Sequence, residues 1–496
     1  MRINCLVLAV FFFRLHAQAQ QTWTRLSEGL ALDVELCGQL GTGDYAPLWL
    51  SSNRYGMGST ESNAAYERIT LARPIQVDSI RHWKVGYALD LALQQNALAS
   101  FTVQQAYVEA KWKKLQLTIG AKQQPMDLKN QALSSGGLSM GINAKPIPQV
   151  RAEADYFSIP GTHGWWKWKG RLSYGRMTDD NWVKDVSTGT SRYTTGTLYH
   201  EKALYWKFGR EDKFPLTYEI GIQMATEFGG TSYNASGRGY DEPTTIKHDS
   251  GLSAFFDALL ARGSDETDGY QENTAGNTVG SYNMALTWHA HRWMARAYFE
   301  RFFEDQSMLT LQYGIQDHLI GIEIQRKGHV APVKTLVIEH LSTRNQSGAV
   351  YHDPTTSLPE KMNGRDNYYN HHLYNGWQHW GQNIGTPLLT SPIYTVDSYG
   401  QVYCYNNRVK AWHIAFDGQP LPILYYRVKL SFTENWGTYT YPFDDKLNQQ
   451  YLMAECRFLP PHRPGLSIAF ALAYDHGDVL GESLGAQLTL AQRFNL

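Results

Sequence analysis

The most distinctive chemistry of this chain lies in one segment, residues 365–382, where aromatic rings alternate with amides, histidines and an arginine. Flat aromatic rings can lie against the C–H face of a sugar, while amides and a guanidinium can hydrogen-bond its hydroxyl groups. The pattern therefore predicts a carbohydrate-binding surface. Its candidate contact residues are Arg365, Asn367, Tyr368, Tyr369, His372, Tyr374, Trp377 and Trp380. A loop that packs its own rings, or joins the aromatic belt of a membrane interface, would have the same composition.

A second segment, Gly137-Leu138-Ser139-Met140-Gly141, matches the G-x-S-x-G motif of hydrolase nucleophile elbows. That motif works on a strand-to-helix turn of an α/β sheet, with a downstream aspartate and histidine. Here it lies in a stretch rich in Gly, Ser and Pro, and no ordered triad is legible among the 17 histidines. No catalytic residue is therefore assigned. A lipase or glycosidase in the outer membrane stays an alternative behind the two non-enzymatic functions given at the end of this section.

Pairs of histidines and pairs of aspartates raise the question of a metal site or a glycosidase. They are His371-His372, His289-Ala290-His291, Asp179-Asp180 and Asp444-Asp445. The histidine pairs lack cysteine or carboxylate partners at the spacing of zinc sites. The aspartate pairs stand beside Asn181 and Pro442, as turn residues do, so they are not assigned the roles of glycosidase carboxylates. The sequence thus predicts no metal site and no cofactor.

The end of the chain, residues 484–496, alternates like a β-strand with one apolar face. Its apolar residues are Leu484, Ala486, Leu488, Leu490, Phe494 and Leu496. Because successive side chains of a strand point to opposite faces, all of these lie on one side of the sheet, and only Gln492 breaks the register. This pattern at the end of a chain is typical of the closing strand of an outer-membrane β-barrel.

The same alternation recurs along the whole chain, with charged residues opposite the apolar rows. The clearest segments are residues 83–94, 115–122, 150–156, 166–174, 216–224, 282–288, 320–325, 426–432 and 466–474. Charges that face away from lipid suit the wet interior of a barrel. With tilted strands of about 9–11 residues, we expect about 18 strands. The predicted fold is all-β: a transmembrane antiparallel outer-membrane β-barrel with long surface loops.

The first 19 residues have the features of a secretory signal peptide. Arg2 precedes an apolar stretch over residues 3–13, and Ala17-Gln18-Ala19 resembles a cleavage site. We therefore expect the mature chain to begin at Gln20. No later segment has about 18 uninterrupted apolar residues, so no membrane-spanning helix is expected. No repeat is evident, and residues 20–496 are predicted to form one barrel domain in the cell outer membrane.

Three stretches interrupt the alternation. Residues 128–148 are rich in Gly, Ser and Pro and are predicted to form a loop. Residues 251–262 place Leu and Phe at helical spacing, which predicts a short amphipathic helix, tucked into the barrel or capping it. Residues 343–401 form the longest irregular stretch, far beyond normal loop lengths. Long loops of outer-membrane barrels are extracellular, so we expect function to reside in this last segment.

Charge and cysteine content narrow the classes of partner. Without residues 1–19, which include Arg2 and Arg14, 43 of the 45 basic residues remain against 46 acidic ones, a formal net charge of −3. Nothing in this balance indicates nucleic-acid binding. Cys37, Cys404 and Cys456 also remain, so at most one disulfide can form, and the sequence does not choose the pair.

Several motifs resemble those of a known family, the Wzi-type outer-membrane capsule-assembly proteins. The similarity is clearest at residues 47–56 (PLWLSSNRYG), 143–151 (NAKPIPQVR), 159–161 (IPG), 198–203 (LYHEKA) and 366–377 (DNYY to Trp377). It covers nearly the whole mature chain. The resemblance implies a monomeric barrel of about 18 strands that retains exported capsular polysaccharide, as a lectin and not as an enzyme. It also implies a helical element at the periplasmic end, for which the sequence offers only residues 251–262.

These observations together predict a non-enzymatic surface lectin that binds and retains capsular or exopolysaccharide. Its expected partners are that polysaccharide and the lipid and lipopolysaccharide of the outer membrane, with the capsule export machinery as a further candidate. Weak contacts would suffice, because many repeat units of a polymer raise the effective concentration. The alternative is a porin or solute channel, since barrels of 16–18 strands can enclose an aqueous lumen.

Overall fold

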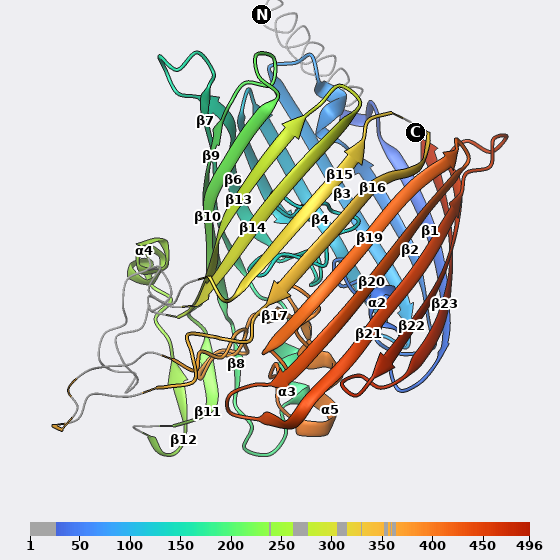
Figure 1. Cartoon of the computed structure of the whole chain (residues 1–496). Helices are drawn as coiled ribbons and strands as arrows, with labels where there is room; N and C mark the ends of the chain where they lie inside the picture. Colours follow the sequence, from blue (N-terminus) through green and yellow to red (C-terminus); the bar gives the residue numbers. More distant parts are fainter. Residues whose placement is uncertain are drawn as a thin grey trace, which may run out of the picture.

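Eighteen strands form one closed antiparallel sheet (Figure 1). The computed structural model describes residues 26–237, 240–260, 276–304, 315–328, 330–351, 356–357, 359 and 364–496. Each barrel strand pairs with the next, and β1 closes the barrel on β23 from Ala31↔Asn495 to Thr42↔Leu484. The predicted β-barrel of about 18 strands is confirmed. The predicted signal peptide lies outside the described residues.

The barrel strands have these bounds in chain order: β1 (Ala31–Thr42), β2 (Ala64–Arg73), β3 (Trp83–Gln95), β4 (Phe101–Trp112), β5 (Leu115–Ala121), β6 (Gln149–Ser158), β7 (Trp166–Arg176), β9 (Leu198–Phe208), β10 (Leu216–Phe228), β13 (Asn277–His289), β14 (Trp293–Glu304), β15 (His318–Arg326), β16 (Ala331–Ser342), β19 (Val409–Leu421), β20 (Leu424–Gly437), β21 (Pro442–Phe458), β22 (Leu466–Gly477) and β23 (Ser483–Asn495).

The alternation of side chains separates an apolar outer face from a polar inner wall, as β15 illustrates. Ile320, Ile322 and Ile324 point outward and keep 43%, 51% and 46% of their surface exposed. Glu323, between them, points inward, is buried, and accepts a hydrogen bond from Asn130 at 2.9 Å. An apolar band outside and a polar interior are the arrangement that lipid imposes on a spanning barrel.

The helices are all short. In the part of the chain that the structure describes, no helix has the length and apolar character needed to cross a membrane. They are α2 (Leu48–Ser51), α3 (Asp180–Val186), α4 (Leu252–Leu260) and α5 (Val396–Tyr399), with 3-10 turns η1 (Ile75–Asp78) and η4 (Pro392–Tyr394).

The two ends of the barrel differ. At the end where β23 finishes, strands are joined by short turns, such as residues 113–114 between β4 and β5 and 422–423 between β19 and β20 (Figure 1). The opposite end carries the long connections, residues 122–148 and 343–408. Short turns of outer-membrane barrels are periplasmic and long loops are extracellular. The long connections therefore mark the extracellular end.

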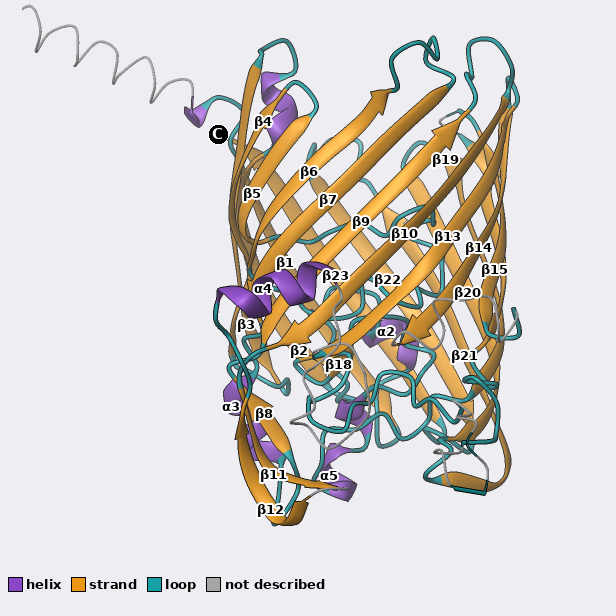
Figure 2. Ribbon diagram, turned by 90° about the vertical axis from the view of Figure 1, so that its left-hand side faces the viewer, coloured by secondary structure: helices purple, strands orange, loops and turns teal. Residues whose placement is uncertain are grey.

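Two of these connections turn into the lumen and form the core of the molecule (Figure 2). We call residues 122–148 and 366–406 the plug. Leu138, Tyr369 and Trp377 of the plug share one hydrophobic cluster with the inner wall, including Phe302 of β14 and Met453 of β21. The loop predicted over residues 128–148 is confirmed as irregular, and it is buried. Within the plug, β17 (Gln378–His379) and β18 (Gln382–Asn383) make a two-stranded hairpin.

Beyond the rim, β8 (Tyr193–Thr195), β11 (Thr231–Gly237) and β12 (Tyr240–Lys247) form a small separate sheet (Figure 2). It stands at the extracellular end, outside the ring of barrel strands.

The predicted amphipathic helix is present as α4, but its predicted placement inside or across the barrel is wrong. It lies on the outer wall, beside the extracellular halves of β9 and β10 (Figure 2). The Lys202 ammonium, on the outer face of β9, donates to the carbonyls of Ala258 (3.0 Å) and Leu259 at its last turn. Cations are stabilised near the C-terminus of a helix. This contact therefore accounts for a lysine on the lipid-facing surface.

Candidate binding site at the plugged end of the barrel

Buried carboxylates of the inner wall hold the first plug segment. Glu339 of β16 accepts hydrogen bonds from the Ser134 hydroxyl (2.6 Å) and the Ser135 backbone N–H (2.7 Å). Glu300 of β14 accepts the backbone N–H of Leu138 at 2.9 Å and pairs with Lys129 at 2.7 Å. Charge-assisted hydrogen bonds of this kind are stronger than neutral ones. The glycine- and serine-rich composition of residues 128–148 thus serves backbone anchoring inside the barrel.

The serine of the G-x-S-x-G motif belongs to this anchoring. Ser139 is buried, and its hydroxyl accepts a hydrogen bond from Gln223 Nε2 at 2.7 Å and shares one with Ser281 at 2.7 Å. No histidine is among its hydrogen-bond partners in the described chain. A nucleophile elbow also needs a strand-to-helix turn, which this irregular segment lacks. In this structure Ser139 is an anchoring residue of the plug.

Four of the eight predicted carbohydrate contacts are core residues of the plug. Tyr368, Tyr369, Tyr374 and Trp377 keep at most 2% of their surface exposed. Tyr368 donates to Asp317 at 3.0 Å, and its ring packs edge-on against Phe302 at 4.7 Å. A sugar can stack only on a ring face that it can reach. The alternative interpretation of a loop packing its own aromatic rings therefore describes these four residues.

Three further predicted contacts stand at the margin of the plug. Asn367 donates to the Tyr403 hydroxyl at 2.6 Å, and exposed Arg365 donates to the Tyr439 carbonyl at 3.0 Å. His372 is half-buried beside His371, with ring centroids 4.3 Å apart. Burial lowers the pKa of His372 to about 4, so its imidazole is neutral at pH 7. A carbohydrate role for these three residues stays a prediction.

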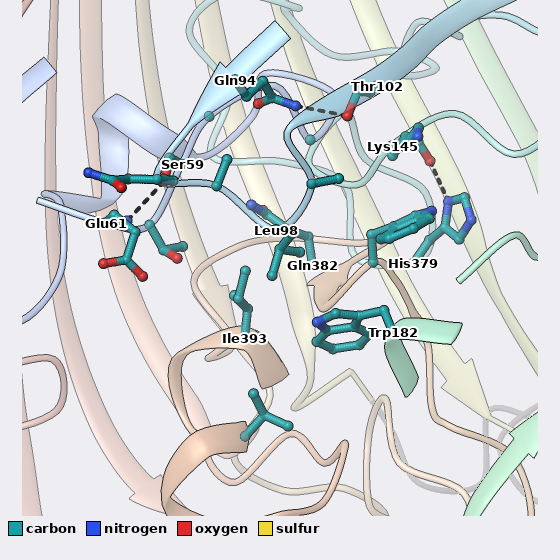
Figure 3. A pocket seen from close by; sticks show the side chains of 18 of the residues that line it. Ser59, Glu61, Gln94, Leu98, Thr102, Lys145, Trp182, His379, Gln382 and Ile393 are labelled. Carbon is teal, nitrogen blue, oxygen red and sulfur yellow. Dashed lines mark hydrogen bonds between the residues drawn. The ribbon is translucent and has the colours of Figure 1, made fainter. Parts of the chain in front are cut away.

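The eighth predicted residue, Trp380, lines a cavity of about 370 Å³ at the extracellular end (Figure 3). The side chains come from five separate parts of the chain, including the β1–β2 connection, the β3–β4 hairpin, α3 and the plug. Aromatic and apolar walls are provided by Tyr45, Leu98, Phe101, Trp182, Trp380 and Ile393, and polar groups by Ser59, Glu61, Gln94, Asn96, Lys145, Gln382 and Asp397.

Trp380 is held rigidly at this cavity. Its backbone has a positive φ of 56°, a conformation that few non-glycine residues adopt. Asp179 accepts its backbone N–H at 3.2 Å, and Thr178 Oγ1 accepts its indole N–H at 3.2 Å. The ring packs against a buried cluster formed by Trp182 and Val183 of α3 with Val396 and Val402. Strained backbone held by surrounding contacts is a recurrent feature of ligand sites.

A single cation lies over this ring. The Lys145 ammonium is 5.0 Å from the centroid of Trp380, within cation–π range, and burial lowers the pKa of Lys145. The carbonyl of Lys145 accepts a hydrogen bond from His379 Nδ1 at 2.8 Å, drawn in Figure 3, and burial lowers the pKa of His379. On the opposite side of the cavity, Gln94 donates to Thr102 at 2.8 Å.

This arrangement suits a neutral or partly charged sugar. The half-buried ring of Trp380 offers a face for stacking, the largely buried ring of Trp182 adds to the apolar wall, and amides, a hydroxyl, a lysine and two carboxylates surround them. No group of three or more histidines, cysteines or carboxylates that could hold a metal ion occurs among the described residues. Trp182 and Lys145 were not predicted as site residues, because neither lies in the aromatic segment and only the folding of separate loops brings them to Trp380.

The inner wall below the plug is polar and crossed by ion pairs. Asp127 pairs with Lys169 at 2.7 Å and with Arg171, and Arg151 pairs with Glu201 at 2.7 Å. Asp127, Arg151, Lys169 and Arg171 border a cavity of about 220 Å³ beneath the extracellular plug. The lining of this cavity also includes Lys111, Lys114, Glu153 and Asp155, so basic side chains outnumber acidic ones there.

Comparison with known proteins gives a likeness of fold. No family model matches the chain, and no curated protein matches it. It superposes on Escherichia coli Wzi, described as a carbohydrate-binding β-barrel involved in group 1 capsule assembly, with a TM-score of 0.54 and 13% identity over 97% of this chain and 88% of that one. Pseudomonas aeruginosa OccK5 (OpdH; TM-score 0.47, 8% identity, 94% and 98% covered) and OprD (0.45, 10%, 94% and 95%) are also similar.

The closed 18-stranded antiparallel barrel, apolar outside and polar inside, defines an outer-membrane β-barrel protein. The cell outer membrane is its location. Within that class, the chain shares the fold of Wzi.

Proposed function

We propose that this protein is a non-enzymatic surface lectin that binds capsular or exopolysaccharide at the extracellular end of the barrel and retains it there. The observation that carries the proposal is the cavity lined by Trp380 and Trp182, where an accessible tryptophan ring, an apolar wall and polar groups converge. The fold shared with a barrel described as carbohydrate-binding supports the same reading. The plug supports it too, because a packed interior holds the loops at the extracellular end in fixed positions for binding.

The barrel is proposed to act as a monomer in contact with outer-membrane lipid and lipopolysaccharide. Its sheet closes on itself through β1 and β23, so no barrel strand has a free edge to pair with a second copy. The capsule export machinery remains a candidate partner that supplies the polymer.

The deciding experiment measures binding of purified surface polysaccharide from the native cell to the mature protein, folded in detergent. We expect saturable binding that the same glycan competes and an unrelated glycan does not. Trp380→Ala should weaken it about tenfold, since an aromatic contact of this kind contributes roughly 1 kcal/mol beyond the area it buries. Trp165→Ala, at an exposed periplasmic turn, is the matched control and should bind normally.

Two outcomes would count against the proposal. Absence of binding by the unaltered protein would remove the lectin function. Normal binding by folded Trp380→Ala would remove the cavity from the mechanism.

A solute channel is the second candidate, favoured by the polar cavity between Lys169 and Arg151 on the inner wall. A steady single-channel current across planar bilayers would support it. The buried plug predicts that such currents are small in the unaltered protein.

A further inference from the structure

Three arginines gather at the extracellular rim. Arg344 lies two residues after the end of β16, Arg408 precedes the first residue of β19, and Arg365 stands at the entrance to the plug. Arg344 and Arg365 are exposed, and Arg408 is half-buried. Arg408 Nε donates to the Arg344 carbonyl at 3.2 Å, so the two are immediate neighbours.

Aromatic rings, and not carboxylates, lie beside these guanidinium groups. Arg408 is 3.9 Å and Arg365 is 5.8 Å from the centroid of the same ring, Tyr439. Arg344 is 4.5 Å from the ring of Trp436. Both rings belong to the end of β20 and the turn that follows it. The cations therefore rest on two neighbouring aromatic rings, and beyond the bonds that Arg365 and Arg408 donate to backbone carbonyls each guanidinium has further N–H groups.

Within the described residues, none of the three arginines has an ion pair with a carboxylate. Two acidic residues near these arginines, Asp317 and Asp366, already accept other hydrogen bonds. Asp317 is buried and accepts the backbone N–H groups of Asn345 (2.9 Å) and Gln346 (2.6 Å). Asp366 accepts the hydroxyl of Ser347. Three like charges that have no direct ion pair among the described residues repel one another, and an anion bound among them would relieve that repulsion.

A row of tyrosines extends the same surface. Ring centroids are 4.0 Å apart for Tyr399 and Tyr405, 4.7 Å for Tyr403 and Tyr405, and 5.5 Å for Tyr405 and Tyr441. Tyr399 and Tyr441 keep more than half of their surface exposed. Tyr441 lies two residues from Tyr439, which joins the row to the arginines. We call these seven arginines and tyrosines, with Tyr439 and Trp436 beneath them, the arginine–tyrosine strip.

We propose that the arginine–tyrosine strip binds an acidic polysaccharide, with guanidinium groups holding the carboxylates of uronic acid residues and tyrosine rings stacking on neighbouring sugars. This inference rests on the proposed lectin function and narrows its substrate to an anionic glycan. It also gives a place to Asn367, whose side chain donates to Tyr403 of the row at 2.6 Å.

The strip favours a glycan over lipopolysaccharide phosphate as the source of the anion. A planar guanidinium matches both carboxylate and phosphate. However, exposed rings continue the surface away from the arginines, and rings add binding energy for sugar faces, not for an isolated phosphate. The strip also lies at the extracellular rim, with Tyr399 on α5 beyond the ends of the strands (Figure 1).

The test uses the mature protein in detergent and two forms of one probe. Polygalacturonate oligosaccharides carry a carboxylate on each sugar, and reduction of those carboxyl groups gives a neutral probe of the same length. The variant is Arg344→Gln/Arg365→Gln/Arg408→Gln. Its control is Arg176→Gln, an exposed arginine at the extracellular end of β7 that is paired with Asp180 at 3.2 Å.

We expect the unaltered protein to bind the acidic probe with an affinity that falls as salt rises, and to bind the reduced probe at least tenfold more weakly. The triple variant should lose about tenfold or more for the acidic probe, while Arg176→Gln changes affinity less than twofold. Arg408→Lys should lie between, because lysine keeps the charge but loses the planar fork.

Equal binding of both probes, or normal binding by the triple variant, would overturn the strip as an anion site. Competition of the acidic probe by lipopolysaccharide but not by the native polysaccharide would assign the arginines to phosphate and overturn the glycan proposal. Native polysaccharide that binds the triple variant normally would leave the lectin function standing and remove the strip alone. Binding of the acidic probe without binding of the native polysaccharide would remove the proposed function and keep the strip.

Discussion

Trp377 donates its indole N–H to the carbonyl of Ser139 at 2.6 Å in the centre of the barrel. The residue with the strongest signature of sugar stacking and the serine of a hydrolase-like motif are thus partners in one structural contact. It joins the two plug segments, 238 positions apart in the chain. Both residues are buried, so the contact stabilises the interior that supports the extracellular surface.

Trp377→Ala should loosen the plug and leave the barrel closed. Truncating a fully buried tryptophan costs about 3–5 kcal/mol of stability, and here the loss should fall mainly on the packing of the plug inside the lumen. We expect faster protease cleavage within residues 366–406 and larger, noisier single-channel currents in planar bilayers. Trp165→Ala should change neither. A protease-resistant, silent Trp377→Ala protein would show that the contact does not hold the plug.

Ser139→Ala should have only a small structural effect. It removes one acceptor of Gln223 Nε2, which keeps the Ser281 hydroxyl at 3.2 Å as a second acceptor, so the loss should be about 1 kcal/mol, that of one hydrogen bond. Hydrolysis of p-nitrophenyl esters should equal the detergent blank both for the unaltered protein and for Ser139→Ala. Ester hydrolysis that is above the detergent blank and disappears in Ser139→Ala would revive the hydrolase alternative.

Acidification should loosen the part of the plug around His371 and His372. Burial lowers the pKa of His371 well below its usual value and that of His372 to about 4, against about 6.5 unfolded. The unfolded segment therefore binds more protons between pH 6.5 and 4, and stability falls as the pH drops through that window. For His372 the loss approaches about 3 kcal/mol, since 1.4 kcal/mol corresponds to each pKa unit.

Hydrogen exchange of residues 366–380 at pH 7.5 and pH 5 would measure this loss of stability. His372→Asn should reduce the pH dependence and leave the part due to His371, while His462→Asn, at an exposed periplasmic turn, should leave it unchanged. Equal protection at both pH values in the unaltered protein would contradict the prediction.

Helix α4 should lie in the outer leaflet of the membrane. Phe255 packs on Tyr174 and Phe228 of the outer wall, with ring centroids 5.1 Å apart in both pairs. Leu252, Phe256 and Leu260 form an exposed apolar row facing away from it. One apolar side of α4 is buried against the barrel wall, and the other would be buried if it lay in lipid.

Spin labels at Phe256→Cys, in a Cys456→Ser background, would locate α4. We expect the label to be accessible to oxygen and shielded from a water-soluble relaxation agent, as a label at lipid-facing Ile322→Cys should be. A label at Thr440→Cys, exposed on the extracellular rim, is the aqueous standard. If position 256 behaves like position 440, α4 stands in water.

The barrel was open to prediction because its signal is local. A strand such as β15 shows the pattern within its own residues, with isoleucines at alternate positions and Glu323 between them. Because lipid surrounds the barrel, every strand needs this alternation, whatever its place in the sheet. The strand number followed from chain length and strand length. The position of α4 did not follow, since the helical spacing of residues 252–260 is equally compatible with a place in the lumen, across its mouth or on its outer wall.

The candidate site depended on contacts between distant segments. Residues 365–382 have one composition, yet Trp377 is enclosed against Ser139 while Trp380, three positions later, borders a cavity with Trp182 and Lys145. Aromatic and amide side chains suit a packed interior and a sugar-binding surface equally well, and no pattern within the segment separates the two. The sequence by itself determined the barrel, through a period of two that each strand carries alone. Only the tertiary structure decided which rings are plug and which are surface, because burial depends on the wall carboxylates and loops that fold around them.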